Sequence, residues 1–127
     1  MILTVVEDLI FLSKIQETGK ALSVEVRAAT VPEALPRLRE GSARGLLIDL
    51  NHRSGGALEL IQKLKAEPAT ADIPVVGFLS HVQTDLAASA RSAGCDMVLA
   101  RSVFVKQLPG LLAKLDAPKS ESTTPSN

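Results

Sequence analysis

The stretch GLLIDLN (45–51) decides the fold, because three apolar residues run straight into a carboxylate, Asp49. A short apolar run of this kind, bounded by Gly45 and by the loop sequence HRSGG, is typical of a buried strand. A carboxylate at the end of a buried strand is costly to desolvate unless another group pairs with it. The function of this chain therefore depends on which other residues reach Asp49.

Working outward from this stretch, strand-like and helix-like segments alternate along the chain. Strands are expected at 2–6, 22–26, 45–49, 73–80 and 96–100. Apolar residues at helical spacing follow each strand. The first four helices are expected to end near Gly19, Gly41, Pro68 and Gly94.

Local signals refine two of the expected helices. Thr30 and Glu33 have the spacing of a capping box at the start of the second helix, and Pro36 inside that helix should kink it. Leu108 to Leu115 carry the apolar stripe of the last helix, so Pro109 is expected in its first turn, where a missing amide costs little.

Alternating strands and helices predict an α/β fold, a doubly wound five-stranded parallel sheet with helices on both faces. The first, third, fourth and fifth strands are near-continuous apolar runs, as doubly buried strands are, whereas 22–26 is more polar and belongs at an edge. This favours the strand order 2-1-3-4-5. We expect one domain over residues 1–116 and a disordered tail at 117–127, which is rich in Pro, Ser and Thr.

Composition excludes several classes of function. Among 127 residues the formal net charge is zero, Trp and Tyr are absent and Phe occurs three times, which argues against binding to nucleic acid or an anionic membrane. No apolar run reaches the length of a membrane span, and the N-terminus lacks the basic region of a secretory signal. The single cysteine, Cys95, is interpreted as small buried filler in a cytoplasmic protein.

The carboxyl ends of the strands should bring several polar residues to one edge of the sheet. These are Glu7, Asp8, Asp49, Ser80 and Arg101. Crowded carboxylates repel unless a cation lies among them, and hard oxygen donors with room for water suit Mg²⁺. A hydroxyl and a permanent positive charge opposite them complete a site for the oxygens of a phosphoryl group. Asp49 would then be the covalent acceptor.

At this point the sequence resembles response-regulator receiver domains, which belong to the CheY-like superfamily and have a flavodoxin-like fold. LTVVED resembles the first strand of the family, and GLLIDLN resembles the strand that ends in the phospho-acceptor. IPVVGFLS resembles the strand that ends in the switch hydroxyl. AGCDMVLARSVF resembles the segment in which the family carries a nearly universal lysine. The resemblance implies a metal site at Glu7, Asp8, Asp49 and the main-chain carbonyl of Asn51, with Asp49 as phospho-acceptor, Ser80 as switch hydroxyl and Arg101 in the place of the lysine.

The function that the resemblance implies is that of a stand-alone receiver of a two-component phosphorelay. Its partners would be a histidine kinase or phosphotransfer protein, which supplies the phosphoryl group, and a downstream protein target. It would bind Mg²⁺ and would have no enzyme activity beyond self-phosphorylation and autodephosphorylation.

The sequence also departs from the family. Arg101 is a planar fork where the family has a lysine, Ser102 replaces a proline, and Val98 replaces an aromatic residue that couples to the hydroxyl. The loop HRSGGA after Asp49 is atypical. These departures favour an alternative, a pseudo-receiver that acts as a phosphorylation-independent protein-interaction module.

Both histidines of the chain fall at the same edge. His81 follows Ser80 and is expected to narrow access to Asp49, and His52 lies three residues after Asp49. Two hypotheses stay open beside the simplest interpretation, that these are exposed loop residues without a role. One is a zinc site with Asp49, since imidazole suits zinc better than magnesium. The other is a site that responds to pH near neutrality.

Overall fold

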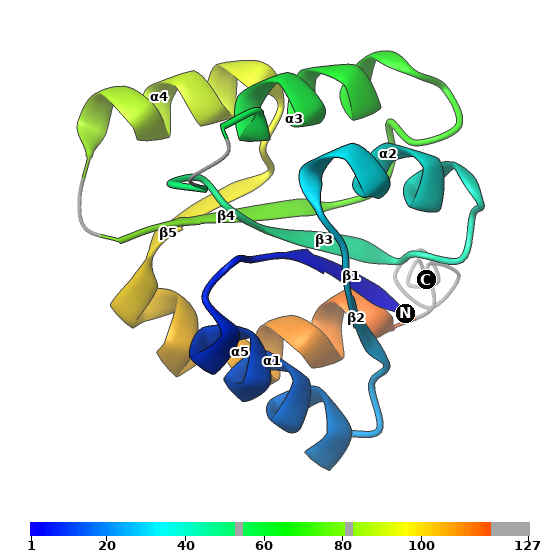
Figure 1. Ribbon diagram of the computed structural model, residues 1–127, viewed down its shortest axis with the longest axis vertical. Coiled ribbons are helices and arrows are strands. Elements are labelled where there is room, and N and C mark those ends of the chain that lie inside the picture. The colour runs from blue at the N-terminus through cyan, green and yellow to red at the C-terminus, as the bar shows by residue number, and fades with distance from the viewer. Residues whose placement is uncertain (53–54, 81–82, 118–127) are drawn as a thin grey trace, which may run out of the picture.

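A computed structural model describes residues 1–52, 55–80 and 83–117 of the chain. This part of the chain forms a five-stranded parallel sheet with the order β2-β1-β3-β4-β5 (Figure 1). The strands are β1 (Ile2–Val5), β2 (Val26–Ala28), β3 (Gly45–Asp49), β4 (Val75–Leu79) and β5 (Met97–Ala100). The helices are α1 (Leu9–Ala21), α2 (Val31–Arg39), α3 (Ala57–Ala66), α4 (Thr84–Ala93) and α5 (Arg101–Asp116). The predicted fold class and strand order are confirmed.

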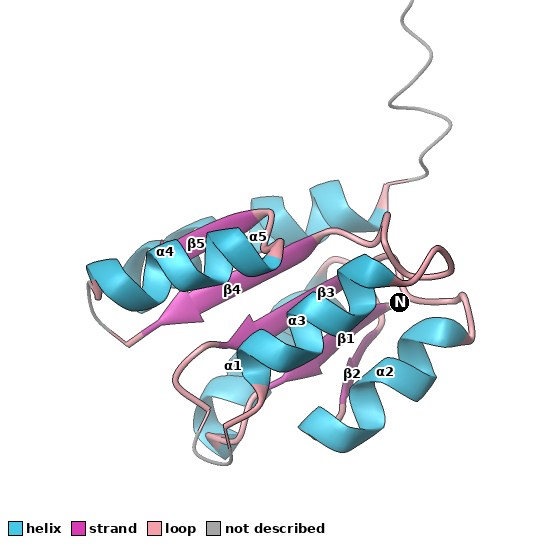
Figure 2. Cartoon of the chain, turned by 90° about the horizontal axis from the view of Figure 1, so that it is seen from above, coloured by secondary structure: helices cyan, strands magenta, loops and turns pink. Residues whose placement is uncertain are grey.

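The sheet lies between two layers of helices. Figures 1 and 2 show α2, α3 and α4 on one face and α1 and α5 on the other. Each layer buries its own hydrophobic cluster, one built around Leu46, Ile48 and Leu64 and the other around Ile15 and the chain's phenylalanines. The central strands β1, β3 and β4 are buried at every position, because helices cover them on both sides.

The strand register aligns the carboxyl ends of the central strands. Val5 pairs with Ile48, Asp49 pairs with Phe78, and Leu79 pairs with Ala100. The residues that come after β1, β3, β4 and β5 therefore meet at one edge of the sheet, which is where the sequence predicts the functional site.

The second strand lies later in the chain than the sequence suggests. The pattern of alternation predicts a strand at 22–26, but β2 covers only Val26–Ala28. The reason is that α1 does not end at Gly19, which is buried within the helix. A side chain on Gly19 would meet the Val24 carbonyl oxygen at 2.8 Å, so the glycine lets the returning chain pack directly against the helix.

Helix signals are confirmed at some positions and wrong at one. The Thr30–Glu33 capping box forms in α2, Pro36 lies inside that helix, and Gly94 ends α4 with a left-handed φ of 112°. The prediction for Pro109 is wrong, because α5 begins at Arg101 and Pro109 lies in its interior. An interior proline lacks the amide that would bond to the preceding turn, so packing of α5 against the sheet must offset that loss.

Strand β5 forms an exposed edge and is not doubly buried, contrary to its apolar sequence. All four of its residues are half-buried, as the strand order requires of the last strand.

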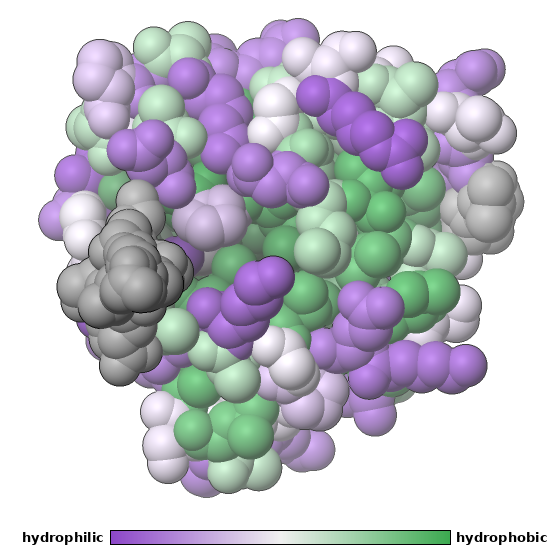
Figure 3. Space-filling view, turned by 180° about the vertical axis from the view of Figure 1, so that it is seen from behind, coloured by the Kyte–Doolittle hydropathy of each residue, from purple (hydrophilic) through white to green (hydrophobic). Residues whose placement is uncertain are grey.

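Figure 3 shows the molecule from behind, and on the face seen there hydrophobic residues gather in the middle and polar residues surround them. Next to β5, Cys95 is buried as expected. In the part of the chain that the structure describes, no helix combines the length and apolar character needed to cross a bilayer.

Candidate functional site

Asp8 holds the start of α1 and also faces a cation. Its Oδ1 accepts hydrogen bonds from the backbone amides of Ile10 (3.0 Å) and Phe11 (3.1 Å), which makes it the N-cap of the helix. Its other oxygen, Oδ2, lies 3.8 Å from Nη1 of Arg101. One carboxylate therefore both fixes the first turn of α1 and contributes negative charge to the site.

Asp49 is nearly buried and uses its two oxygens in different ways. The residue is only 7% exposed. Oδ1 accepts a hydrogen bond of 2.9 Å from the Asn51 amide, and Oδ2 lies 3.8 Å from Nη2 of Arg101. The carboxylate at the end of GLLID is thus paired with a guanidinium and held by its own loop, which explains how the strand can end on a charge.

Arg101 joins the two carboxylates from the first position of α5. Its terminal nitrogens each face one of them, Nη1 toward Asp8 and Nη2 toward Asp49. Since a helix N-terminus carries a partial positive charge, α5 adds to the positive potential that both carboxylates meet. The Nε atom of Arg101 is buried without a hydrogen-bond partner in the described part of the chain.

An aromatic cluster lies beneath the guanidinium. The central carbon of the Arg101 guanidinium is 4.5 Å from the centroid of the Phe11 ring and 5.9 Å from that of Phe78. The rings of Phe11, Phe78 and Phe104 lie 4.6 to 5.8 Å apart between centroids. These three are all the aromatic residues of the Phe, Tyr and Trp classes in the chain. The Arg101 guanidinium, which carries the permanent positive charge of the site, therefore packs against the hydrophobic core.

Ser80 is connected to Asp49 through Asn51. The Asn51 side-chain oxygen accepts hydrogen bonds from the Ser80 amide (2.8 Å) and the Ser80 hydroxyl (3.1 Å). The Asn51 side-chain nitrogen donates to Oε1 of Gln83 at 2.8 Å. One asparagine side chain therefore links the loop after β3 to the end of β4 and to the residue before α4. The role predicted for the Asn51 main-chain carbonyl as a metal ligand stays a prediction.

Glu7 and His52 face each other at the side of the site. His52 Nδ1 lies 3.6 Å from Oε1 of Glu7, and the imidazole is only 5% exposed. The expectation of an exposed loop histidine is therefore wrong for His52, because the turn from Asp49 to His52 brings the ring to the end of β1, beside Glu7. His81 lies outside the described residues.

The donor set at these carboxylates fits a hydrated magnesium ion. Within the described ranges, no group of three or more His, Cys, Asp and Glu side chains could hold a metal. The carboxylates of Asp8 and Asp49, by contrast, already face one positive charge, and Mg²⁺ commonly binds to one or two carboxylates while it keeps several waters. Hard oxygen atoms aimed at a common cation match that requirement.

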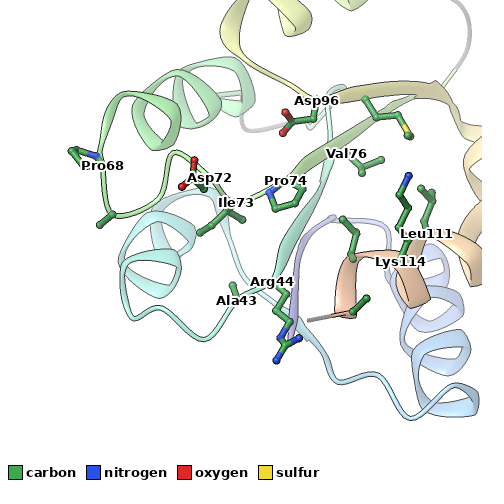
Figure 4. A pocket seen from close by; sticks show the side chains of 14 residues that line it. Ala43, Arg44, Pro68, Asp72, Ile73, Pro74, Val76, Asp96, Leu111 and Lys114 are labelled. Atoms are coloured by element: carbon green, nitrogen blue, oxygen red, sulfur yellow. The ribbon is translucent and has the colours of Figure 1, made fainter. Parts of the chain in front are cut away.

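A cavity of about 800 Å³ lies away from these carboxylates. It is lined by residues that precede the strands, among them Arg44 and Pro74, and by Leu111 and Lys114 of α5 (Figure 4). These positions are at the amino ends of the strands, so the cavity is separate from the candidate site at the carboxyl ends.

Sequence reasoning missed three residues that shape the site. Phe11 and Phe78 lie under the guanidinium of Arg101. Gln83 accepts a hydrogen bond from the side-chain nitrogen of Asn51. The sequence does hold a weak signal for Phe11, which comes three residues after Asp8 on the first turn of a helix. No local pattern places Gln83 beside Asn51, because the contact joins two loops that are distant in the chain.

Comparison with known proteins agrees with this architecture. No protein-family model matches the sequence, and no curated protein matches it. Among solved structures, a response regulator from Hahella chejuensis has a TM-score of 0.81 at 14% identity over 91% of this chain and 94% of its own. A response regulator from Thermotoga maritima has a TM-score of 0.74 at 20% identity, with 90% and 94% covered.

A third similar structure is the Mn²⁺-bound form of the response regulator Rcp1. Its TM-score is 0.74 at 18% identity, and the alignment covers 92% of this chain and 95% of that one. Identities this low establish the architecture and not the activity. The chain has the fold of response-regulator receiver domains.

Proposed function

We propose that this chain is a signalling receiver that accepts a phosphoryl group on Asp49. The observation that carries the proposal is the way in which the Asp49 carboxylate is held. Its Oδ1 is fixed by the Asn51 amide, whereas Oδ2 faces the Arg101 guanidinium at 3.8 Å, without a hydrogen bond to another described residue. One oxygen is therefore oriented by the loop, and the other is directed toward a positive charge that can receive an anionic group.

The transfer would form one bond and break another. A carboxylate oxygen of Asp49 attacks the phosphorus of a phosphohistidine on a kinase or phosphotransfer protein, the phosphorus–nitrogen bond breaks, and the imidazole leaves with the electron pair. Arg101 stabilises the negative charge on the phosphoryl oxygens. Glu7, Asp8, Asp49 and the Asn51 carbonyl would hold Mg²⁺, which supplies further positive charge to the same oxygens. The Mn²⁺-bound structural neighbour supports the proposal that a chain of this fold binds a divalent ion.

Ser80 is the group that would report the change. Its hydroxyl donates a hydrogen bond to the side-chain oxygen of Asn51, and in the proposed mechanism it would turn toward a phosphoryl group on Asp49. Loss of that hydrogen bond would alter the link from Asn51 to Gln83, at the start of α4. The signal would then pass to a downstream protein by contact.

Mass spectrometry of the intact protein tests the proposal. The protein is incubated with Mg²⁺ and acetyl phosphate, and we expect the mass of one added phosphoryl group, which hydroxylamine removes. Asp49→Asn should abolish the gain. Asp85→Asn is the matched control, because Asp85 is an exposed acid in the first turn of α4 and should leave the gain unchanged. A gain that persists in Asp49→Asn would contradict the assignment.

A second candidate function is a phosphorylation-independent interaction module. The observation that favours it is Arg101, which pairs with both Asp8 and Asp49 and so compensates their charge without a metal ion. If wild-type protein gains no phosphoryl group and beryllofluoride leaves its amide resonances unchanged, this second function replaces the first.

A further inference from the structure

The Arg101 guanidinium faces the two carboxylates that would hold the metal of the proposed site, and the rings of Phe11 and Phe78 lie beneath it. We propose that Phe11 and Phe78 form an aromatic seat that holds the Arg101 guanidinium between Asp8 and Asp49, so that Arg101 competes with the divalent cation for these carboxylates. This inference rests on the proposed function. Phe11 is then a positioning residue, which acts on the metal through Arg101.

The contacts of Arg101 define the seat. The guanidinium carbon lies 4.5 Å from the Phe11 centroid, well inside the range of about 6 Å in which a cation is attracted to a ring face. The Phe78 centroid, at 5.9 Å, is at the limit of that range. The Arg101 side chain is only 32% exposed, so the interaction is partly shielded from water.

The seat is itself fixed in position. The Phe11 amide donates to Oδ1 of Asp8, so the residue that carries the ring is tied to one of the carboxylates that Arg101 faces. The ring is 5.1 Å from Phe78, which is fully buried in β4. The aromatic surface therefore keeps a constant place relative to both carboxylates.

Arg101 and a metal ion would use the same oxygen atoms. The terminal nitrogens of Arg101 face Oδ2 of Asp8 and Oδ2 of Asp49, and each of these two oxygens accepts no hydrogen bond from another described residue. An ion that binds both carboxylates must move the guanidinium away from them, and the aromatic seat opposes that movement. A lysine would be a weaker competitor, because it has no planar group to stack and no fork to span two carboxylates.

Weakening the seat should therefore strengthen metal binding. A cation–π contact is attractive at an exposed site and stronger where the cation is partly shielded from water. Removing the Phe11 ring, with the Phe78 contact kept, should tighten Mn²⁺ binding on the order of three- to tenfold.

The test is isothermal titration calorimetry, which measures the affinity of the protein for Mn²⁺ in the absence of a phosphodonor. The variant is Phe11→Leu, and its control is Phe104→Leu, which removes another ring of the same cluster that makes no contact with Arg101 among the described interactions. We expect tighter binding in Phe11→Leu and unchanged binding in Phe104→Leu. Arg101→Lys should bind at least as tightly as Phe11→Leu. Circular dichroism confirms folding, and Phe11→Met replaces Phe11→Leu if the latter does not fold.

Two results would overturn the inference. One is equal Mn²⁺ affinity in the wild type and in the folded Phe11 variant, which would show that metal and guanidinium do not compete. The other is the absence of binding both in the wild type and in Arg101→Lys. The phosphorylation of Asp49 is a separate readout, because titration needs no phosphodonor. Protein that shows the expected order of affinities but gains no phosphoryl group would contradict the proposed function alone.

Discussion

Asp8 has two roles in the structure, and a pair of substitutions separates them. Its Oδ1 caps α1, and its Oδ2 faces Arg101 across 3.8 Å. Asp8→Ala removes both roles. Asp8→Asn keeps a side-chain oxygen for the Ile10 and Phe11 amides, because asparagine is as good an N-cap as aspartate, but it removes the charge.

The two variants should differ in their free energy of unfolding. Loss of an N-cap costs about 1 kcal/mol. The Asp8–Arg101 pair is partly exposed on both sides, with 47% and 32% of the side chains accessible, so its loss should cost no more than about 0.5 kcal/mol. We therefore expect Asp8→Ala to lose about 1 to 1.5 kcal/mol and Asp8→Asn to lose about 0.5 kcal/mol.

Urea unfolding followed by far-ultraviolet circular dichroism measures these changes, since the chain has no Trp or Tyr for fluorescence. Glu17→Ala is the control, because Glu17 is an exposed acid on the same helix, and its replacement should change stability by less than about 0.5 kcal/mol. If Asp8→Asn is as destabilising as Asp8→Ala, the charge and not the cap stabilises this end of α1, and the reasoning is refuted.

Other contacts lead to three further predictions. Burial raises the pKa of the Cys95 thiol above its ordinary value of 9.0, so the folded state holds the thiol proton more tightly than the unfolded state does. The free energy of unfolding that this proton contributes is complete at lower pH and should decline as the pH rises above 9.0. Alkylation of Cys95 at pH 8 should be slow until urea unfolds the chain. Gly94→Ala should lower the free energy of unfolding by about 2 kcal/mol, because φ is 112° and a Cβ would lie 2.7 Å from Cγ of Lys65; an unchanged urea midpoint would contradict this. Gly77→Ala should cost about 1 to 2 kcal/mol, because its Cβ would lie 2.9 Å from the Leu50 side chain, and a variant as stable as the wild type would show that Leu50 can repack freely.

The sheet could be predicted because its strands are specified locally. GLLID and the apolar runs before Glu7 and Ser80 are short and β-rich, and helical stripes separate them. Once the strand order is known, the convergence of Asp8, Asp49 and Arg101 results from the parallel topology alone.

Other features depend on contacts between distant segments. Gly19 has the sequence signal of a helix end, yet α1 continues because the chain near Val24 packs onto the space that the glycine leaves. Pro109 is tolerated inside α5 because Leu108 and Leu111 on either side of it are buried in the core. His52 is buried beside Glu7, which comes from the end of a different strand. In each case tertiary packing decides where the residue lies, and a local sequence pattern carries no information about that packing.

The site shows the same division between local and long-range information. The residue types at the strand ends predict Asp49 and its charge partner by position, whereas nothing local predicts that the Arg101 guanidinium packs on the ring of Phe11, which comes from another helix. Apolar residues of this kind carry no chemical signature in a sequence.

The hydrogen bond from Asn51 to Gln83 has a consequence for the start of α4. Gln83 is the N-cap residue of α4, but its side chain makes no capping hydrogen bond to the helix and instead accepts the Asn51 amide. The first amides of α4 therefore lack the side-chain protection that Asp8 gives α1, and they should exchange with deuterium faster than those of α1. Loss of the Asn51 side chain, as in Asn51→Ala, should speed that exchange further at the start of α4 and leave the first turn of α1 as it was.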